Sequence, residues 1–417
     1  MRALQRSPSQ PEVICAPGNA GIALDARCFD VAADDVDGLV RLAADEGADL
    51  TIVGPEAPLV AGLVDSLEEA GLRAFGPSAA AARLEGSKAW AKDLMRDAGI
   101  PTAAHTVFTT YEEAEAQMDC ASYPAVLKAD GLAAGKGVII AAEPREARAA
   151  LRGFFLEERF GEAGSRVVVE EYLDGEELSL LALCDGETAI PMAPAQDFKR
   201  IGEGDTGLNT GGMGSYSPVP EFDGSRARDL VREVHQPVVD LLRRRGTPYR
   251  GVLYAGLMMT SAGPRVLEFN CRFGDPETQA VLPRLRSDLL ELLDSSTRDG
   301  GLQGRELEWT PESAVTVVLA SRGYPESSSS GDVIEGLEDV DGVEVTHAGT
   351  ALREGSIVTA GGRVLNITAL GPSLEDARER AYRAVEAIRF DGAQYRRDIA
   401  AAAAAGAKLT TAFSKGD

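Results

Sequence analysis

The chain has 417 residues, 44% of them hydrophobic, and its 42 basic and 66 acidic side chains give a formal net charge of −24. This length exceeds one ordinary hydrophobic core, so we expect two to four domains. The acidic balance opposes binding to nucleic acid or an anionic membrane, and without a long apolar segment or a signal peptide we expect a soluble, cytoplasmic protein.

Short apolar runs alternate with helical patterns over the first 99 residues. Strands are expected at 13–16, 50–53 and 73–75, and helices at 36–46, 59–70 and 88–98. This alternation is typical of a doubly wound α/β domain, whose ligands lie at the carboxyl ends of the strands. Two turns at such ends supply four candidate binding residues, Gly18, Asn19, Pro55 and Glu56.

A glycine-rich loop, 129–137, joins expected strands at 125–128 and 138–140. Its glycines leave backbone N–H groups free to approach phosphate. Lysine is scarce, with seven in the chain, yet Lys128 and Lys136 lie at the two ends of this loop. It is not a Walker loop, because it lacks the Gly-Lys-Ser/Thr ending and a strand follows it. A flexible hairpin is the alternative.

An acidic bend, 170–177, separates strands expected at 167–170 and 178–183. Its backbone groups can read an adenine edge, and a nearby carboxylate could take ribose hydroxyls. A simple acidic turn is the alternative.

The segment 209–214 is rich in small residues, which are suited to close contact with a small substrate. A solvated linker is the alternative.

The segment 267–278 carries most of the chemistry. Glu268 and Asn270 lie two apart on an expected strand, so they project to one face, where hard oxygens suit Mg²⁺ on nucleotide phosphates. Arg272 continues that face and could clamp a phosphoryl oxygen or a substrate carboxylate. An edge strand running into a turn is the alternative.

The five cysteines and three histidines are scattered, which argues against a disulfide framework and a zinc site.

Antiparallel strands with intervening helices indicate that the middle of the chain is an α+β unit. After a linker near 297–306, strands expected at 314–320, 342–347 and 362–369 and a helix at 373–388 indicate a third, smaller α+β unit.

The order of these motifs is that of ATP-grasp enzymes, and five segments resemble the phosphoribosylamine–glycine ligase family: 16–21, 54–59, 128–137, 209–214 and 268–278. The resemblance covers nearly the whole chain from Val13 onward. It implies a doubly wound domain at 1–99, an ATP-grasp domain at 100–300 with a nucleotide-covering subdomain at about 124–187, and an α+β domain at 307–417.

The activity implied by the resemblance is ligation of glycine to 5-phosphoribosylamine in de novo purine biosynthesis, with ATP and Mg²⁺ or Mn²⁺. Glycine's carboxylate would attack the γ-phosphoryl group, and the ribosylamine would attack the resulting glycyl phosphate. The phosphoryl transfer requires mainly that the phosphate charge is neutralised and that the reacting groups are aligned. We expect small-molecule partners, no nucleic acid or membrane, and a monomer.

Residue roles follow from the same resemblance. The resemblance implies that the nucleotide phosphates are bound by Lys88, Lys128, Gly135, Lys136 and Gly137. Adenine would be bound by Glu170, Glu171, Tyr172 and Leu173, and the ribose by Glu177. Glu268 and Asn270 would hold the metal ion. We hypothesise that Arg272 and Asp275 serve the acyl-phosphate step and the glycine. A loop would cover them, made of Asn209, Thr210, Gly211, Gly212, Met213 and Gly214.

The amino terminus departs from the family, whose members begin with a strand and a Gly-Gly-Arg-Glu-His loop. The missing strand is normally interior to the sheet, so its absence would leave its neighbours unpaired. We expect a misplaced start, or a chain that binds ATP and responds weakly to the ribosylamine. Two other readings stay open: a ligase for another amine, and an ATP-binding protein without catalysis.

Overall fold

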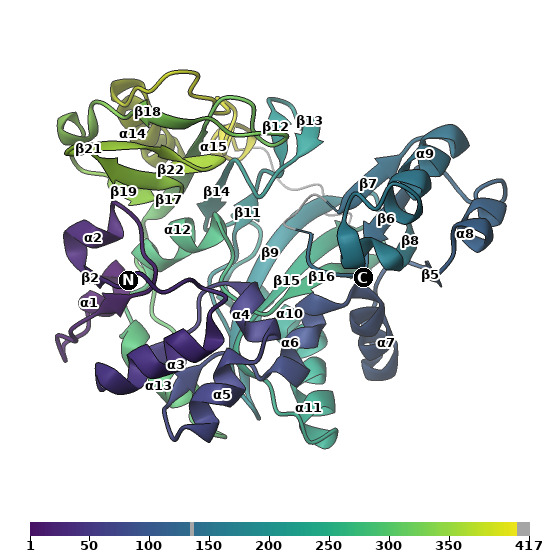
Figure 1. Cartoon of the computed structure of the whole chain (residues 1–417), viewed down its shortest axis with the longest axis horizontal. Coiled ribbons are helices and arrows are strands. Elements are labelled where there is room, and N and C mark those ends of the chain that lie inside the picture. The colour runs from purple at the N-terminus through teal and green to yellow at the C-terminus, as the bar shows by residue number, and fades with distance from the viewer. Residues whose placement is uncertain (134–136, 407–417) are drawn as a thin grey trace, which may run out of the picture.

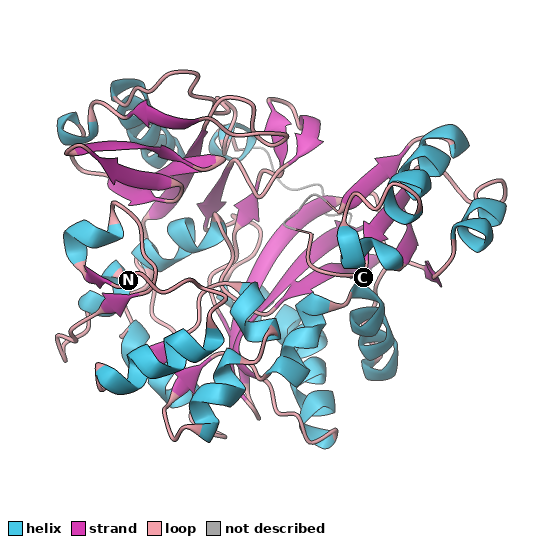
Figure 2. Ribbon diagram, in the orientation of Figure 1, coloured by secondary structure: helices cyan, strands magenta, loops and turns pink. Residues whose placement is uncertain are grey.

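The computed structural model describes residues 1–133 and 137–406, whose elements form an N-terminal region, a projecting lobe, a central region and a C-terminal region (Figure 1). Helices and strands are mixed in all four (Figure 2). None of the helices in the described ranges is both long and apolar enough to cross a membrane.

The N-terminal region holds two separate parallel strand pairs and seven helices. Its elements are α1 (Arg2–Gln5), β1 (Ile14–Cys15), α2 (Ile22–Asp25), β2 (Arg27–Cys28), α3 (Val36–Asp45), β3 (Thr51–Ile52), α4 (Glu56–Val60), α5 (Leu63–Glu69), β4 (Ala74–Phe75), α6 (Ala79–Gly86) and α7 (Lys88–Ala98). β1 pairs with β2 and β3 with β4, but no ladder joins the two pairs within the described residues.

Local signals set the helix ends in this region. The helix expected at 59–70 is divided into α4 and α5, because Gly62 adopts a φ of +89° between them. α7 begins after Ser87, whose hydroxyl accepts from the N–H of Trp90, and ends at Gly99 with a φ of +71°. These are the usual N-cap and C-cap residues, and they fix Lys88 at the first turn of α7.

The lobe has a hydrophobic core of its own and projects from the body in Figure 1. Its elements are β5 (His105–Phe108), α8 (Tyr111–Gln117), β6 (Ala125–Ala129), β7 (Val138–Ala141), α9 (Pro144–Phe155), a 3₁₀ turn (Gly161–Ser165) and β8 (Val167–Glu171). The sheet order is β5-β8-β6-β7, all antiparallel. β6 and β7 form the expected hairpin, with Lys128 opposite Val138.

The central region is a four-stranded antiparallel sheet covered by helices. Its strands are β9 (Glu176–Asp185), β10 (Ala189–Pro191), β15 (Arg250–Thr260) and β16 (Gly263–Asn270), in the order β10-β9-β15-β16. Its helical elements are α10 (Gly224–Leu230), the π-helical turn η2 (Val231–His235), α11 (Gln236–Arg244), α12 (Glu277–Val281), the 3₁₀ turn η3 (Leu282–Arg284) and α13 (Leu289–Ser296). β15 is almost entirely buried, which makes this sheet a rigid support for β16 at its edge.

The C-terminal region is built on a five-stranded sheet, β11-β14-β17-β22-β19, with a three-stranded sheet, β18-β21-β20, beside it. Its elements are β17 (Ser313–Ala320), β18 (Ser330–Val333), a 3₁₀ turn (Leu337–Asp339), β19 (Glu344–His347), β20 (Thr350–Arg353), β21 (Ser356–Ala360), β22 (Arg363–Gly371), α14 (Leu374–Ala387) and α15 (Ala401–Ala404).

Two strands of the five-stranded sheet come from the middle of the chain, which the sequence analysis did not foresee. They are β11 (Gln196–Asp197) and β14 (Gly214–Ser217), and β14 pairs directly with β17. The short hairpin β12 (Arg200–Gly202) and β13 (Thr206–Asn209) lies between them in sequence. The five-stranded sheet therefore combines two strands from the middle of the chain with three from the C-terminal region.

Candidate active site

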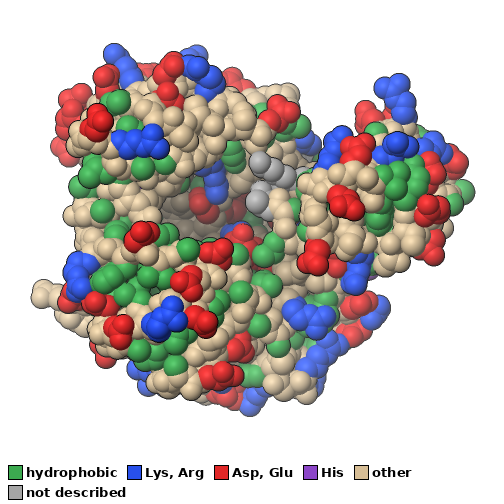
Figure 3. Space-filling view, viewed as in Figure 1, with side chains coloured by type: hydrophobic (Ala, Val, Ile, Leu, Met, Phe, Trp, Pro, Cys, Tyr) green, Lys and Arg blue, Asp and Glu red, His purple; other side chains and the backbone are tan. Residues whose placement is uncertain are grey.

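A cavity of about 1140 Å³ lies where the four regions meet, and Figure 3 shows a hollow there with acidic and basic side chains inside it. Its lining includes these predicted residues: Pro55, Glu56, Lys88, Lys128, Gly137, Glu170, Glu171, Tyr172, Leu173, Glu177, Asn209, Thr210, Gly211, Glu268, Asn270, Arg272 and Asp275. Candidate nucleotide, metal and catalytic residues thus share one space.

Five predicted substrate residues are not in that lining: Gly18, Asn19, Gly212, Met213 and Gly214. The amide of Asn19 donates to the backbone oxygens of His347 and Ala348, so it joins the N-terminal to the C-terminal region. The side chain of Met213 is fully buried, and Gly214 pairs within the five-stranded sheet. Gly135 and Lys136 lie outside the described residues.

Two lysines flank the carboxylate of Glu170 at one end of the cavity. Lys128 Nζ lies 3.0 Å from Glu170 Oε2, and Lys92 Nζ lies 3.0 Å from Oε1. Lys92 is 2% exposed and also donates to the hydroxyl of Thr102. Burial lowers the pKa of Lys92 to about 8, against the attraction of Glu170. This compact arrangement holds Lys128 in place, where it also donates to Leu267 O.

Lys88 and Glu268 both line the cavity, and the ammonium of Lys88 donates to Gly131 O. Burial lowers the pKa of Lys88, and the charge of Glu268 opposes that change. For Glu268, burial favours the neutral acid, but the charges of Lys199, Lys128, Lys88 and Arg272 outweigh it and lower the pKa. The carboxylate of Glu268 is therefore held ionised among cations, as a metal or phosphate site requires.

The donor set on β16 fits a hard divalent cation bound together with phosphate groups. Glu268 and Asn270 share a face of the strand and offer a carboxylate and an amide oxygen. Within the described residues no group of three or more His, Cys, Asp or Glu side chains is placed to hold a metal ion unaided. Mg²⁺ is typically bound in this way, through one or two protein oxygens plus substrate phosphates and water.

Glu177 and the loop at 209–214 are connected through Lys199. Lys199 Nζ donates to Glu177 Oε2 at 2.6 Å. Its backbone oxygen accepts from both the N–H and the hydroxyl of Thr210. The hydroxyl of Thr210 in turn accepts from Gly212 N. The candidate ribose ligand and the candidate covering loop are therefore linked by a chain of hydrogen bonds through Lys199.

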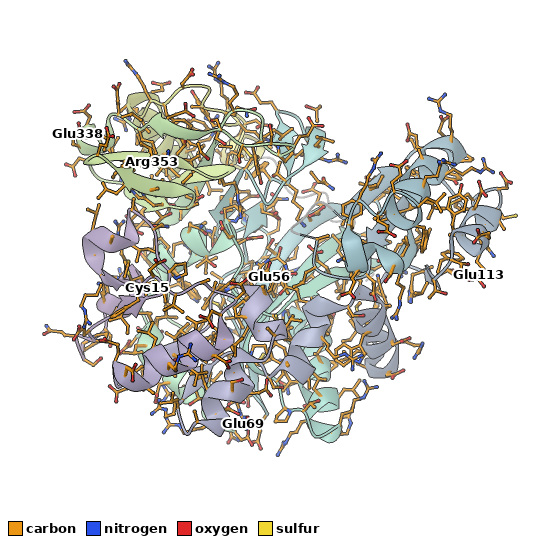
Figure 4. All side chains as sticks on the ribbon, viewed as in Figure 1. Cys15, Glu56, Glu69, Glu113, Glu338 and Arg353 are labelled. Atoms are coloured by element: carbon orange, nitrogen blue, oxygen red, sulfur yellow. The ribbon has the colours of Figure 1, made fainter. Side chains whose placement is uncertain are left out.

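Arg272 is held by two carboxylates of the N-terminal region. Its Nε donates to Glu56 Oε2 at 2.9 Å, and its Nη2 lies 3.2 Å from Glu85 Oε1. Figure 4 shows Glu56, at the start of α4, near the centre of the molecule. Burial raises the pKa of Glu85, and the Arg272 charge opposes that rise. The orientation of Arg272 thus depends on how the N-terminal region packs on β16.

Asp275 is held by Arg363 of the C-terminal region. Arg363 Nη2 lies 3.0 Å from Asp275 Oδ2, and Nη1 donates to Asp275 O at 2.9 Å and to the backbone oxygen of Gly211. The N–H of Gly211 donates to the hydroxyl of Tyr324, also in the C-terminal region. We call Arg363, Tyr324, Asp275 and the Gly211–Gly212 backbone the acceptor clasp.

Several cavity residues were not identified from the sequence as site residues: Glu85, Lys92, Asp197, Lys199, Tyr254, Glu277, Arg363 and Arg396. One signal was available for Lys92, which lies one helical turn after Lys88 in a chain with few lysines. Asp197, Tyr254 and Glu277 converge on the buried hydroxyl of Ser179 from three separate segments. No local pattern in the sequence announces such a cluster.

Comparison with known proteins gives matches along most of the chain. Three family models match in succession: the phosphoribosylglycinamide synthetase N domain at residues 1–85, its ATP-grasp (A) domain at 86–278 and its C domain at 314–402. The phosphoribosylamine–glycine ligase of Streptomyces coelicolor is 51% identical over 408 residues, covering 97% of this chain and 96% of that protein. That of Xanthomonas axonopodis pv. citri is also 51% identical, over 401 residues, covering 95% and 93%.

Solved structures show the same similarity. The phosphoribosylamine–glycine ligase of Thermotoga maritima superposes with a TM-score of 0.81 at 34% identity, covering 95% of this chain and 96% of that one. A biotin carboxylase domain from Hydrogenobacter thermophilus, at 18% identity and a TM-score of 0.72 over 94% of this chain and 88% of that one, shares the fold. The chain belongs to the phosphoribosylglycinamide synthetase family.

Proposed function

We propose that this chain ligates glycine to 5-phosphoribosylamine at the expense of ATP, giving glycinamide ribonucleotide, ADP and phosphate. One observation carries the proposal: a single cavity is lined by Lys88 and Lys128, Glu268 and Asn270, and Arg272 and Asp275. The full-length similarity to ligases of that name supports the choice of substrates.

The nucleotide end supplies charge and alignment. Lys88 and Lys128 neutralise the ATP phosphates, and the backbone of Glu170 to Leu173 holds adenine while Glu177 takes the ribose. Glu268 and Asn270 would hold the divalent cation, Mg²⁺ or Mn²⁺, which when bound neutralises phosphate charge and polarises the transferring group. Gly137 and the preceding residues 135–136 complete the phosphate contacts in this proposal.

The acceptor end orients the two nucleophiles. Arg272 draws the glycine carboxylate to the γ-phosphoryl group, and Asp275 holds the glycine ammonium beside it. One carboxylate oxygen forms a bond to phosphorus while the bond to the ADP oxygen breaks. The amine of the ribosylamine then forms the C–N bond and phosphate leaves, with one amine proton lost to solvent. The loop from Asn209 to Gly214 excludes water from the glycyl phosphate.

Further assignments belong to the same proposal. We place the ribosylamine near Gly18, Asn19, Pro55 and Glu56, and we propose a monomeric, soluble, cytoplasmic enzyme. The division into 1–99, 100–300 with its subdomain at about 124–187, and 307–417 is supported by the separate core of the lobe. The two strands that the middle of the chain adds to the C-terminal sheet cross the second boundary.

Isotope transfer tests the chemistry directly. Glycine labelled with ¹⁸O in its carboxylate should deliver one ¹⁸O atom to the released phosphate for each ribosylamine consumed, because the bridging oxygen of glycyl phosphate leaves with phosphorus. Controls omit glycine or the ribosylamine. Turnover with unlabelled phosphate would overturn the glycyl phosphate route. ATP binding without turnover would favour a nucleotide-binding protein, and turnover only with another amine would favour a different ligase.

A further inference from the structure

A second cavity, of about 630 Å³, lies away from the candidate active site and shares no lining residue with it. It is bordered by the edge strand β10, by α10 and η2, and by the segment 305–309. Its volume is within the usual range for small organic ligands. None of the chemistry proposed above uses it.

Its walls are mainly apolar. Met192, Phe222 and Val231 are each buried almost completely, and Leu307 and Trp309 are half-buried at the side of the segment 305–309. The side chain of Val231 belongs to η2, where the helix is locally wound as a π-helix. Such π-helical turns are rare and occur frequently at functional sites. The cavity therefore offers an apolar, partly aromatic surface.

Arg284 contributes a buried cation to this apolar space. The residue is 5% exposed, and its hydrogen-bond acceptors are all uncharged: Glu312 O, the hydroxyl of Ser217 and Thr310 O. Within the described residues no carboxylate forms an ion pair with it, whereas the equally buried Arg396 pairs with Asp205 and Asp398. Burial lowers the pKa of Arg284 to about 10.

A guanidinium has five N–H donors, so three bonds leave capacity for an anion. Its Cζ lies over the Trp309 ring, 5.9 Å from the ring centroid. A buried charge without a counter-ion is costly, and an anionic ligand would remove that cost.

The other charged residues that line the cavity are three arginines, Arg228, Arg232 and Arg305, and two acids, Asp223 and Glu306, in a chain whose acids outnumber its bases. Arg232 and Arg305 also form ion pairs with Asp229 and Glu291 outside the lining. Asp223 already caps α10 through the N–H groups of Ser225 and Arg226. The lining is thus basic, against the composition of the whole protein.

We propose that this cavity binds a small organic anion, with a carboxylate or phosphate group against Arg284 and an apolar or aromatic body among Met192, Phe222 and Trp309. The two anionic groups are the same chemistry for a guanidinium, because both accept paired N–H donors. The site does not depend on the ligase assignment, because it shares no lining residue with the candidate active site.

Titration calorimetry on the full chain, with saturating ADP to fill the candidate active site, tests the proposal. The probes are 1-naphthoate, 1-naphthyl phosphate and the uncharged 1-naphthalenemethanol. We expect both anions to bind at least about tenfold more tightly than the alcohol, the scale of one charge-assisted bond. Whichever anion binds better identifies the preferred group. Equal affinities for all three probes, or no binding at millimolar concentrations, would overturn the proposal.

Variants of residues that line the second cavity test whether the probes bind there. Arg284→Met should weaken the anions at least about tenfold and leave the alcohol unchanged. Arg286→Met, an exposed arginine two residues away that does not line the cavity, is the matched control. Leu307→Trp narrows the cavity without touching the charge, and should abolish binding of all probes even if Arg284→Met fails to fold. Unchanged anion binding in Leu307→Trp would place the probes elsewhere and reject the site.

Discussion

The two ends of the candidate active site are built differently. At the nucleotide end, Lys92, Lys128 and Glu170 form buried ion pairs within the segment from α7 to β8. At the acceptor end, Arg272 is oriented by the N-terminal region and Asp275 by Arg363 of the C-terminal region. The first end is held mainly within that segment, with one bond from Lys128 to Leu267 O, whereas the second exists only when the N-terminal, central and C-terminal regions pack together. Changes at the acceptor end should therefore alter glycine and ribosylamine kinetics while ATP binding stays intact.

The largest effect is expected from Arg272→Ala. Loss of the guanidinium removes charge stabilisation at the transferring phosphoryl group, and kcat should fall on the order of 10³-fold. ATP affinity, measured by calorimetry, should change little, since Lys88 and Lys128 remain. Arg286→Ala, exposed and outside the cavity, is the control. An equal loss of ATP affinity would show that the two ends are not separable.

Glu170→Gln tests the nucleotide end. The amide leaves the buried cations Lys92 and Lys128 without their shared carboxylate. Removing one partner from buried ion pairs costs about 3–5 kcal/mol, so the free energy of unfolding should fall by that order, together with ATP affinity. Urea unfolding measures the first and calorimetry the second. Glu113→Gln, an exposed residue of the same lobe outside the cavity, should change neither the free energy of unfolding nor the ATP affinity to that extent. Wild-type stability in Glu170→Gln would refute the buried-pair account.

Acid pH should weaken the support beneath β16. His235 is fully buried, donates one hydrogen bond from Nε2 to Leu180 O, and packs edge-on to Phe269, which lies between the candidate metal ligands Glu268 and Asn270. Burial lowers its pKa from 6.5 to about 4. The unfolded chain therefore binds the proton first, and stability is lost as pH falls from 6.5 to 4, by about 3 kcal/mol in total.

Comparing urea unfolding of the wild type with His235→Gln across that pH range isolates this contribution from that of the acidic residues. The difference in stability between the two proteins should shrink toward low pH. A constant difference would mean that His235 is not titrating between the two states.

The smallest effect is expected at the acceptor clasp. In Arg363→Lys a single ammonium cannot hold the backbone oxygens of Gly211 and Asp275 and the Asp275 carboxylate at once. We expect the KM for glycine to rise about tenfold, the scale of one charge-assisted bond, with the KM for ATP unchanged. Arg353→Lys, exposed in the same region, is the control. An unchanged glycine KM would remove Arg363 from the acceptor end.

The difference between the two ends also explains what could be predicted from the sequence. Period-two spacing placed Glu268 and Asn270 on one face, and the hairpin after Lys128 followed from glycines between apolar runs. Contacts between distant segments leave no such signal. Arg363 lies 88 residues from Asp275, and nothing around either residue specifies the pairing.

Fold features divide in the same way. The strands expected at 314–320 and 362–369 are present as β17 and β22, because long apolar runs identify buried strands. β11 and β14 are short and lie in polar, glycine-rich surroundings, so their pairing with β17 depends on the tertiary structure. The break between α4 and α5 depends on one glycine that a helical pattern tolerates.

The acceptor clasp should affect how much ATP is hydrolysed without forming product. Arg363 bonds both the Gly211 backbone and Asp275 with one side chain, so the packing of the C-terminal region and the arrangement of the proposed glycine site depend on the same residue. When these bonds are absent, we expect a bound nucleotide to lack an aligned acceptor, so that ATP is neither hydrolysed quickly nor used to make product.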